Sequence, residues 1–161
     1  MTIGNPSSAH PVVLTAGPRT ITIESNPLIM GVLNVTPDSF SDGGAYVTIE
    51  QAVNHARQMQ AQGADIIDIG AESSRPGAQP IAESEELRRL IPVVEAVREA
   101  VSLPISVDTT KAVVARMAIQ AGAVIVNDIS ALQGDPLMAG LVAETGVAVV
   151  LMHMQGTPQT M

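Results

Sequence analysis

A set of polar residues follows each of several short apolar runs, and these residues have the types needed for chemistry. The set is Asn34, Glu72 to Arg75, Asp108, Asn127 with Asp128, and His153. Carboxylates accept hydrogen bonds, and an Asn amide both donates and accepts them. If the apolar runs are adjacent strands, the polar side chains meet at one mouth, where a heterocycle with ring N–H and amino groups would satisfy them. The pattern therefore predicts a binding site for such a heterocycle.

The segments that must position these residues alternate between strand and helix patterns. The expected strands are 29–33, 64–70, 104–107, 124–126 and 147–152, and the expected helices are 48–63, 83–101, 113–121 and 135–142. Strict alternation predicts a parallel sheet with right-handed crossovers. Polar residues stand at the end of every strand, whereas an open sheet needs them mainly beside its switch point. The sequence therefore favours an α/β barrel.

Several finer expectations concern how these elements begin and end. Asp135 followed by Pro136 predicts the start of the last helix, and Pro92 should kink or break the helix that contains it. Gly63, Gly122 and Gly146 are expected to end helices.

The region before the first barrel strand has a different pattern. Two β-prone pieces, 11–14 and 20–23, flank a Gly-Pro turn, which predicts a β-hairpin. The expected organisation is a disordered tail over 1–9, a hairpin over 10–27 that caps the amino-terminal face of the barrel, and a partial barrel domain over 28–161. A complete barrel takes about 250 residues, so the chain of 161 residues holds about five βα units.

Composition excludes several classes of function. The net charge is −8 with no basic run, which argues against nucleic acid or an anionic membrane as partner. The absence of Cys excludes disulfides, thiolate catalysis and Cys-bound metal. No apolar run approaches the roughly 18 residues of a membrane span, and no signal peptide is expected at the amino terminus. No dinucleotide or P-loop motif is present. The expectation is an acidic, soluble, cytoplasmic α/β protein.

Linked motifs in the chain resemble the dihydropteroate synthase family. They are NVTPDSFSDGG at 34–44, ADIIDIGAESSRPGA at 64–78, ISVDTTK at 105–111, NDIS at 127–130 and MHMQGTP at 152–158. The resemblance implies a (β/α)8 TIM barrel of the pterin-binding type, here truncated to about five βα units. It also implies an enzyme of folate biosynthesis and a sulfonamide target. Such an enzyme joins 6-hydroxymethyl-7,8-dihydropterin pyrophosphate to p-aminobenzoate and releases pyrophosphate with the help of Mg2+.

The resemblance also implies roles for particular residues. Asn34 would be the Mg2+ ligand beside the pyrophosphate, and Asp108 and Asn127 would hold the edge of the pterin ring. The remaining substrate-binding residues would be Thr36 and Asp38 in a closing loop with Pro37, Phe40 and Ser41, and Phe40, Ser74, Arg75 and Pro76 around p-aminobenzoate. Asn34, Asp108 and Arg75 would be the catalytic residues, and the full-length protein would be a homodimer.

Other interpretations remain open at this point. The chain could be a catalytically inactive pterin-binding fragment, or the pterin-binding module of a methyltetrahydrofolate-dependent methyltransferase. Asp108 could cap the helix that follows it, Asp68 could serve structural hydrogen bonds, and Glu72 could pair with Arg75. The acidic and basic residues at 83–89 are expected on a solvated helix face, and His153 is expected to position a loop.

Overall fold

The computed structural model describes residues 11–24, 26–36, 49–73 and 79–153. The elements in chain order are β1 (Val12–Ala16), β2 (Arg19–Ile23), β3 (Met30–Asn34), α1 (Ile49–Ala61), β4 (Ile66–Gly70), α2 (Glu83–Ala100), β5 (Ile105–Asp108), α3 (Ala112–Ala121), β6 (Ile125–Asp128), α4 (Met138–Thr145) and β7 (Ala148–Leu151). The predicted tail over 1–9 and residue 48, the expected first residue of the first helix, lie outside the described residues.

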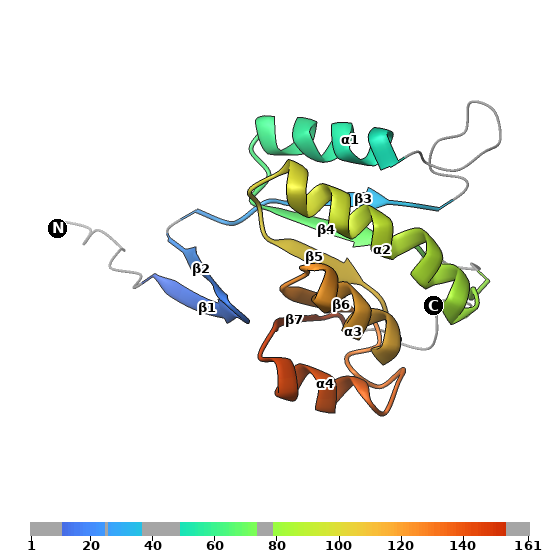
Figure 1. Ribbon diagram of the computed structural model, residues 1–161. Helices are drawn as coiled ribbons and strands as arrows, with labels where there is room; N and C mark the ends of the chain where they lie inside the picture. The colour runs from blue at the N-terminus through green and yellow to red at the C-terminus, as the bar shows by residue number, and fades with distance from the viewer. Residues whose placement is uncertain (1–10, 25, 37–48, 74–78, 154–161) are drawn as a thin grey trace, which may run out of the picture.

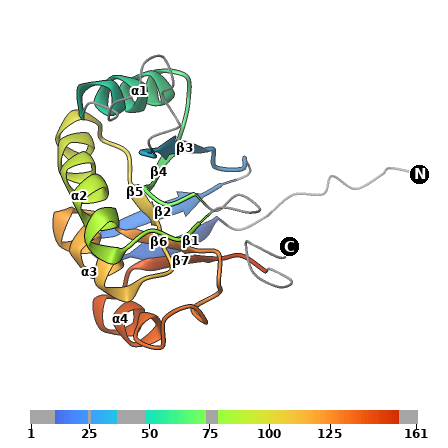
Figure 2. The same cartoon turned by 90° about the vertical axis from the view of Figure 1, so that its right-hand side faces the viewer.

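The five later strands form one parallel sheet in the order β3-β4-β5-β6-β7. Each strand lies beside the strand that precedes it in the chain, as in a barrel, and the order never reverses as it does at a switch point. The four helices cover one side of the sheet (Figures 1 and 2). This arrangement confirms the predicted fold class, an α/β barrel of about five βα units preceded by a hairpin.

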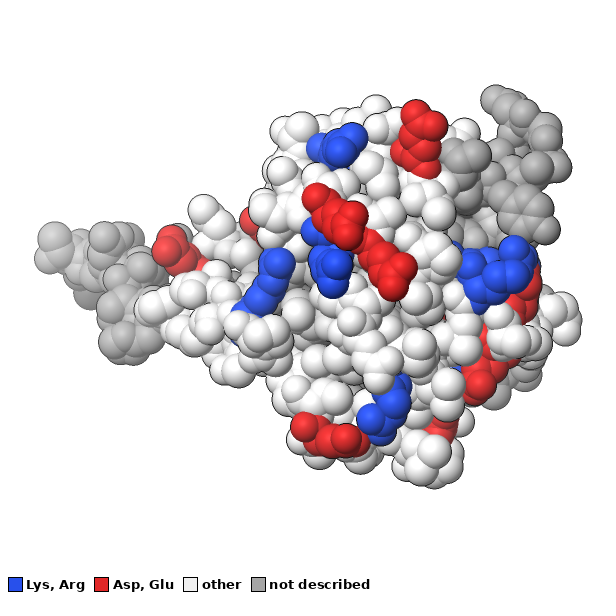
Figure 3. Space-filling model, viewed as in Figure 1, with Lys and Arg blue, Asp and Glu red and all other residues white. Residues whose placement is uncertain are grey.

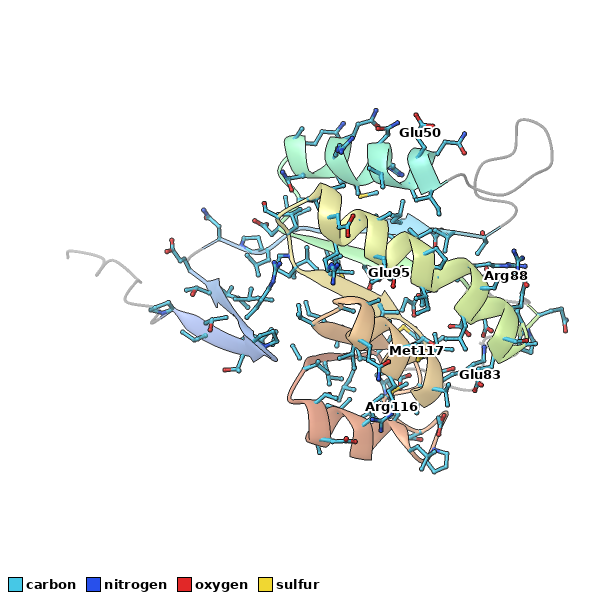
Figure 4. All side chains as sticks on the ribbon, in the orientation of Figure 1. Glu50, Glu83, Arg88, Glu95, Arg116 and Met117 are labelled. Carbon is cyan, nitrogen blue, oxygen red and sulfur yellow. The ribbon has the colours of Figure 1, made fainter. Side chains whose placement is uncertain are left out.

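The side of the sheet that faces the helices, called the outer face below, is apolar. Leu33, Ile67, Ile69, Val107 and Val126 alternate along the strands and pack with helix residues such as Leu90 and Val94 in one buried cluster. These strands are covered on that face, which explains why their apolar residues are Val, Ile and Leu with nearly no aromatics. Charged side chains of both signs are scattered over the helices (Figure 3), and Glu50, Glu95 and Arg116 point outward (Figure 4).

The opposite side of the sheet, called the inner face, is covered at one end by the hairpin. Strands β1 and β2 pair antiparallel, as predicted. Ala16 and Ile21 of the hairpin pack with the start of β4, β6 and β7, where the buried residues are Ile66, Val124, Ile125 and Ala148. The hairpin therefore closes the inner face at the amino ends of the strands, and the carboxyl ends remain for a site.

The helix ends match the expectations in some places and differ in others. Gly122 and Gly146 adopt positive φ values of 118° and 66° at the C-caps of α3 and α4, a conformation that glycine adopts without strain. Helix α2 continues through Pro92 without a break. The predicted start of α4 is wrong, because its N-cap is Leu137 and Asp135 lies before the helix. Within the described ranges, no helix has the length and apolar character to cross a membrane.

Candidate functional site

Three of the predicted site residues lie in one row at the carboxyl ends of four neighbouring strands. Asn34 pairs with Gly70, Gly70 with Asp108, and Asp108 with Asn127. Paired residues of a sheet project their side chains to the same face, and neighbouring strands lie about 4.8 Å apart. Asn34, Asp108 and Asn127 therefore lie in line on the inner face, with Asp108 beside Asn127 and Gly70 between Asp108 and Asn34, and we call these three residues the polar row.

Gly70 stands between Asn34 and Asp108, and its lack of a side chain shapes the polar row. A Cβ atom at this position would lie 3.3 Å from the Asp108 Cβ and 3.4 Å from its Oδ2. The space that a larger residue would fill is taken by the Asp108 carboxylate. Sequence reasoning treated Gly70 only as the end of a strand, since its role depends on the register between β4 and β5.

A second polar pair lies one step deeper on the same face. Asp68 on β4 pairs with Ser106 on β5, and both side chains are almost fully buried, at 3% and 0% exposed. The Asn127 side chain donates a hydrogen bond from Nδ2 to Asp68 Oδ2 at 2.9 Å. Among the described residues, Asp68 Oδ1 and the Ser106 hydroxyl lie buried without a hydrogen-bond partner. The structural hydrogen bond predicted for Asp68 therefore has Asn127, a residue of the polar row, as its donor.

The two inner-face carboxylates hold their protons unusually tightly. Burial raises the pKa of Asp68, although the neighbouring Ser106 and Asn127 side chains oppose the rise. Burial also raises the pKa of Asp108 to about 7, with further contributions from the negative charges of Asp68, Glu86, Asp128 and Glu72. Within the described ranges, burial and negative charges account for the raised pKa of Asp108 and no hydrogen-bond donor offsets them, and a ligand carrying N–H groups would supply such donors.

A buried ion-pair network connects the polar row to helix α2. Lys111 Nζ contacts Glu72 Oε2 at 2.6 Å and Glu86 Oε2 at 2.5 Å, and the Thr109 hydroxyl donates to Glu86 Oε1 at 2.7 Å. Burial alone would lower the pKa of Lys111, but its bonds to the two glutamates reverse the effect and raise it. The charge of Lys111 is already paired in this network, so it is a poor candidate for binding a phosphate.

The network corrects one sequence interpretation, the solvated position of Glu86, and leaves the expected pair of Glu72 with Arg75 a prediction. Glu86 was expected on a solvated helix face, yet its side chain is 1% exposed. Its neighbour Glu85 does pair with Arg88 and Arg89 at the surface, at 2.7 Å and 2.6 Å. Glu72 contacts Lys111 and accepts the N–H of Ile81 at 3.0 Å, while Arg75, its expected partner, lies outside the described residues. Helical periodicity did not distinguish Glu86 from its neighbours because the partner comes from another loop.

The two other aspartates near the polar row have structural contacts. Asp128 is fully buried and its carboxylate accepts hydrogen bonds from the N–H groups of Ser130 and Leu132, which fixes the turn after β6. Asp135 accepts the N–H of Ala112, the first residue of α3, at 2.9 Å. The alternative in which Asp108 caps α3 is therefore wrong, because Asp135 from the next βα unit does so.

Not all predicted site residues fall in the described part of the chain. Thr36 lies there, half-buried and two residues beyond β3, and the exposed His153 follows β7. The remaining residues, Asp38, Phe40, Ser74, Arg75 and Pro76, lie outside it, as do Pro37 and Ser41. The described ranges contain no group of three His, Asp or Glu side chains suited to a metal ion.

The comparison with protein families decides where this chain belongs. Residues 30–161 match the family model described as pterin binding enzyme. The chain belongs to this family. The matched region contains every strand of the parallel sheet, and thus the whole polar row.

Individual relatives agree with the family match. The dihydropteroate synthase of Bacillus subtilis is 51% identical over 141 residues, which are 88% of this chain and 50% of the relative. The structure of Xanthomonas albilineans dihydropteroate synthase with 4-aminobenzoic acid is 49% identical with a TM-score of 0.83, over 89% of this chain and 52% of that one. The chain spans about half the length of the curated relatives it matches.

A further structure is that of Burkholderia cenocepacia dihydropteroate synthase complexed with 7,8-dihydropteroate. It is 41% identical with a TM-score of 0.78, and covers 93% of this chain and 49% of its own. The resemblance to dihydropteroate synthases found in the motifs is therefore confirmed.

Proposed function

We propose that this pterin-binding chain serves dihydropteroate synthesis in folate biosynthesis. The reaction condenses 6-hydroxymethyl-7,8-dihydropterin pyrophosphate with p-aminobenzoate, giving 7,8-dihydropteroate and pyrophosphate. The observation that supports it most is the polar row, which sets a carboxylate and two amides in one line at the strand ends of a chain about half identical to dihydropteroate synthases. Relatives of that kind favour this function over the methyltetrahydrofolate-dependent alternative.

The polar row has donors and acceptors suited to the edge of a pterin ring. Asp108 accepts hydrogen bonds from ring N–H or amino groups, and such bonds favour its ionised form. Asn127 can donate and accept on the same edge. A ring held in this way keeps the reacting methylene carbon fixed while the amine nitrogen approaches it. Orientation of this kind lowers the barrier of a reaction between two substrates.

The proposed reaction exchanges one bond for another at the methylene carbon. The amine nitrogen of p-aminobenzoate forms a bond to this carbon, and the carbon–oxygen bond to pyrophosphate breaks. Pyrophosphate leaves with the electron pair, and the nitrogen loses a proton. Charge builds up on the leaving oxygen, so positive groups near it stabilise the transition state. Arg75 is the predicted cation from this chain, because Lys111 is already paired.

The donors at Asn34 fit a Mg2+ that is bound mainly by its substrate. Mg2+ prefers oxygen ligands and keeps several waters or phosphate oxygens when the protein supplies few. Asn34 provides one amide oxygen at the end of β3. Asp128, the fully buried carboxylate near the polar row, is occupied by backbone N–H groups. In the proposal, Asn34 would hold Mg2+, and the ion would neutralise charge on the pyrophosphate.

The remaining parts of the proposal rest on the family resemblance. Thr36, Asp38 and Phe40 would close over the substrates, and Ser74, Arg75 and Pro76 would contact p-aminobenzoate. The protein would act in the cytoplasm on these two small molecules, without nucleic acid or membrane, and the full-length protein would be a homodimer. Sulfonamides would compete with p-aminobenzoate for its site.

Calorimetric titration with the pterin pyrophosphate and Mg2+ tests the proposal. Wild-type chain should bind saturably, and Asp108→Asn should lose at least tenfold in affinity because an NH2 donor replaces one of the two oxygens that accept from the ligand N–H groups. Glu144→Gln is the matched control, since its exposed carboxylate pairs with Arg116 on the helical side. Equal binding by all three chains would contradict the site, and turnover with p-aminobenzoate separates synthesis from binding alone.

A further inference from the structure

We propose that Asp68 is a positioning residue that fixes the orientation of the Asn127 amide. In this orientation the amide presents its oxygen and one N–H to the polar row, which sets a preference for 2-amino-4-oxopteridines over 2,4-dioxopteridines. The inference rests on the proposed function, because it concerns how the pterin edge is recognised. Asp68 itself lies one residue step below the row and contacts the ligand only through Asn127.

The hydrogen bond between the two side chains determines which end of the amide faces inward. The Asn127 side chain donates from Nδ2 to Asp68 Oδ2, so the amide atom beside this carboxylate is the nitrogen. The distance of 2.9 Å is that of a good N–H to oxygen bond. Because the amide group is planar, its Oδ1 then points away from Asp68. This bond uses one of the two N–H groups of Nδ2, and no described residue accepts the other, which is available to a ligand.

Burial makes this arrangement specific. Asp68 is 3% exposed, so water does not compete effectively for the Asn127 N–H. Its second oxygen, Oδ1, and the neighbouring Ser106 hydroxyl lack partners within the described residues. A buried carboxylate with one unsatisfied oxygen costs stability, and packing would favour an apolar residue at this place. Packing therefore does not explain why a carboxylate stands at this position, whereas its hydrogen bond to Asn127 does.

The oriented amide distinguishes between two closely related ring systems. Its oxygen and its free N–H lie side by side, and they match an amino group next to a ring nitrogen acceptor. A 2-amino-4-oxopteridine has that pair on its pyrimidine edge. A 2,4-dioxopteridine has a carbonyl oxygen in place of the amino group, and this oxygen would face Asn127 Oδ1 without a proton between them. Sites that hydrogen-bond a polar group discriminate strongly against an analogue that lacks it.

Removing the charge of Asp68 without changing its shape should release the amide. In Asp68→Asn the new side chain can donate or accept, so Asn127 is free to turn by 180° about its last bond. The matched control is Ser106→Ala, which alters an equally buried neighbour on the adjacent strand but leaves the bond between Asp68 and Asn127 in place.

The experiment is calorimetric titration at pH 8 with 6-hydroxymethylpterin and with 6-hydroxymethyllumazine. Wild type and Ser106→Ala should prefer the pterin by at least tenfold, a difference of about 1.4 kcal/mol. Asp68→Asn should reduce this preference to about threefold or less. A preference unchanged in Asp68→Asn would overturn the inference.

A second measurement needs no variant and no ligand. In an NMR spectrum of the wild-type chain, one of the two Asn127 side-chain amide protons should be shifted downfield and exchange slowly with water, as a buried bond to a carboxylate requires. Two equivalent, rapidly exchanging protons would overturn the inference. Failure of the wild type to bind either pteridine would instead contradict the proposed function, and the Asn127 amide protons would still test the role of Asp68.

Discussion

The two faces of the parallel sheet are made from the same five strands, yet they differ in almost every property. On β4, Ile67 and Ile69 point to the outer face and are fully buried against the helices. Asp68 and Gly70, which alternate with them, belong to the inner face beside Asp108. On the outer face, apolar side chains of the strands pack against apolar side chains of the helices. The inner face holds carboxylates with raised pKa values and buried atoms without hydrogen-bond partners, within the described part of the chain.

This difference indicates which face stabilises the protein and which one binds. Apolar burial contributes to stability in proportion to the area covered. Unsatisfied buried polar groups reduce stability, and they persist where a ligand or a reaction needs them. Substitutions on the outer face should therefore change stability strongly, and those on the inner face should change binding and pH dependence.

The largest effect on stability is expected on the outer face. Ile69→Ala should lower the free energy of unfolding by about 4 kcal/mol, because it removes a fully buried side chain and leaves a cavity. Ser106→Ala on the inner face is the comparison, and we expect a change within about 1 kcal/mol because, among the described residues, the hydroxyl makes at most a weak contact to Asp68. Urea denaturation of both variants measures the difference. Equal losses would contradict the distinction between the faces.

The free energy of unfolding should fall by about 3 kcal/mol when one partner is removed from the ion-pair network of Lys111, Glu72 and Glu86. Lys111→Met removes the cation that pairs with Glu86, whose side chain is 1% exposed, and leaves that charge uncompensated. Combining it with Glu86→Gln should restore part of the stability, because the buried charge is then gone. Denaturation of the single and double variants is the test. If the double variant loses as much free energy of unfolding as the two single variants together, or more, the pairing is refuted.

A change in pH dependence is expected from Asp108. Its pKa of about 7 exceeds the ordinary value near 4, so the folded chain binds this proton more tightly than the unfolded chain. This contribution to stability is fully present below about pH 4 and is lost as the pH rises to about 7. Asp108→Asn should abolish that loss and stabilise the chain by about 2 kcal/mol at pH 8, since the roughly 4 kcal/mol of the full shift is reduced by partial exposure.

Thermal unfolding measured at several pH values between 4 and 8 checks this prediction. Wild type and Asp108→Asn should differ least near pH 4, diverge progressively as the pH rises from about 4 to about 7, and keep a constant difference above that. Parallel curves across the whole range would show that Asp108 titrates at its ordinary value. Stabilisation by a substitution that abolishes ligand binding would also be the sign of a functional rather than a structural carboxylate.

The smallest effect is expected at the solvent-exposed side of the helices. Arg116 pairs with Glu144 at 3.0 Å, and both side chains are about half exposed or more. Such surface pairs contribute little because water screens them and holding two long side chains in place is unfavourable. Arg116→Ala should change the free energy of unfolding by less than about 0.5 kcal/mol, measured by urea denaturation. A fall of more than about 1 kcal/mol in the free energy of unfolding would contradict the expectation that this exposed ion pair contributes little to stability.

The fold was predictable because its signals are local. Apolar runs of strand length, helical spacing and Gly122 and Gly146 at helix ends each appear within a few residues of sequence. The strand order then followed from the alternation of strands and helices. The error at Asp135 is also local in origin, since an Asp before a Pro is a typical start signal. Its carboxylate accepts the N–H of Leu137 as such a signal implies, but it also accepts the N–H of Ala112 in another βα unit, and the helix begins later.

The inner face was predictable only in part, because its contacts cross between strands. Asn34, Asp108 and Asn127 could be named from their places at strand ends. The bond between Asn127 and Asp68, the space left by Gly70 and the burial of Glu86 depend on register and on partners 59, 38 and 25 residues away. No local pattern carries this information.

The most direct test of the central claim is an NMR titration of the Asp108 carboxyl carbon, with and without 6-hydroxymethylpterin. In the free chain the carboxyl should titrate with a midpoint near pH 7, because it is buried among other negative charges. Binding of the pterin should lower that midpoint, since ring N–H and amino groups stabilise the ionised form. A midpoint near 4 that the pterin leaves unchanged would contradict the claim that the inner face is built to hold this ring.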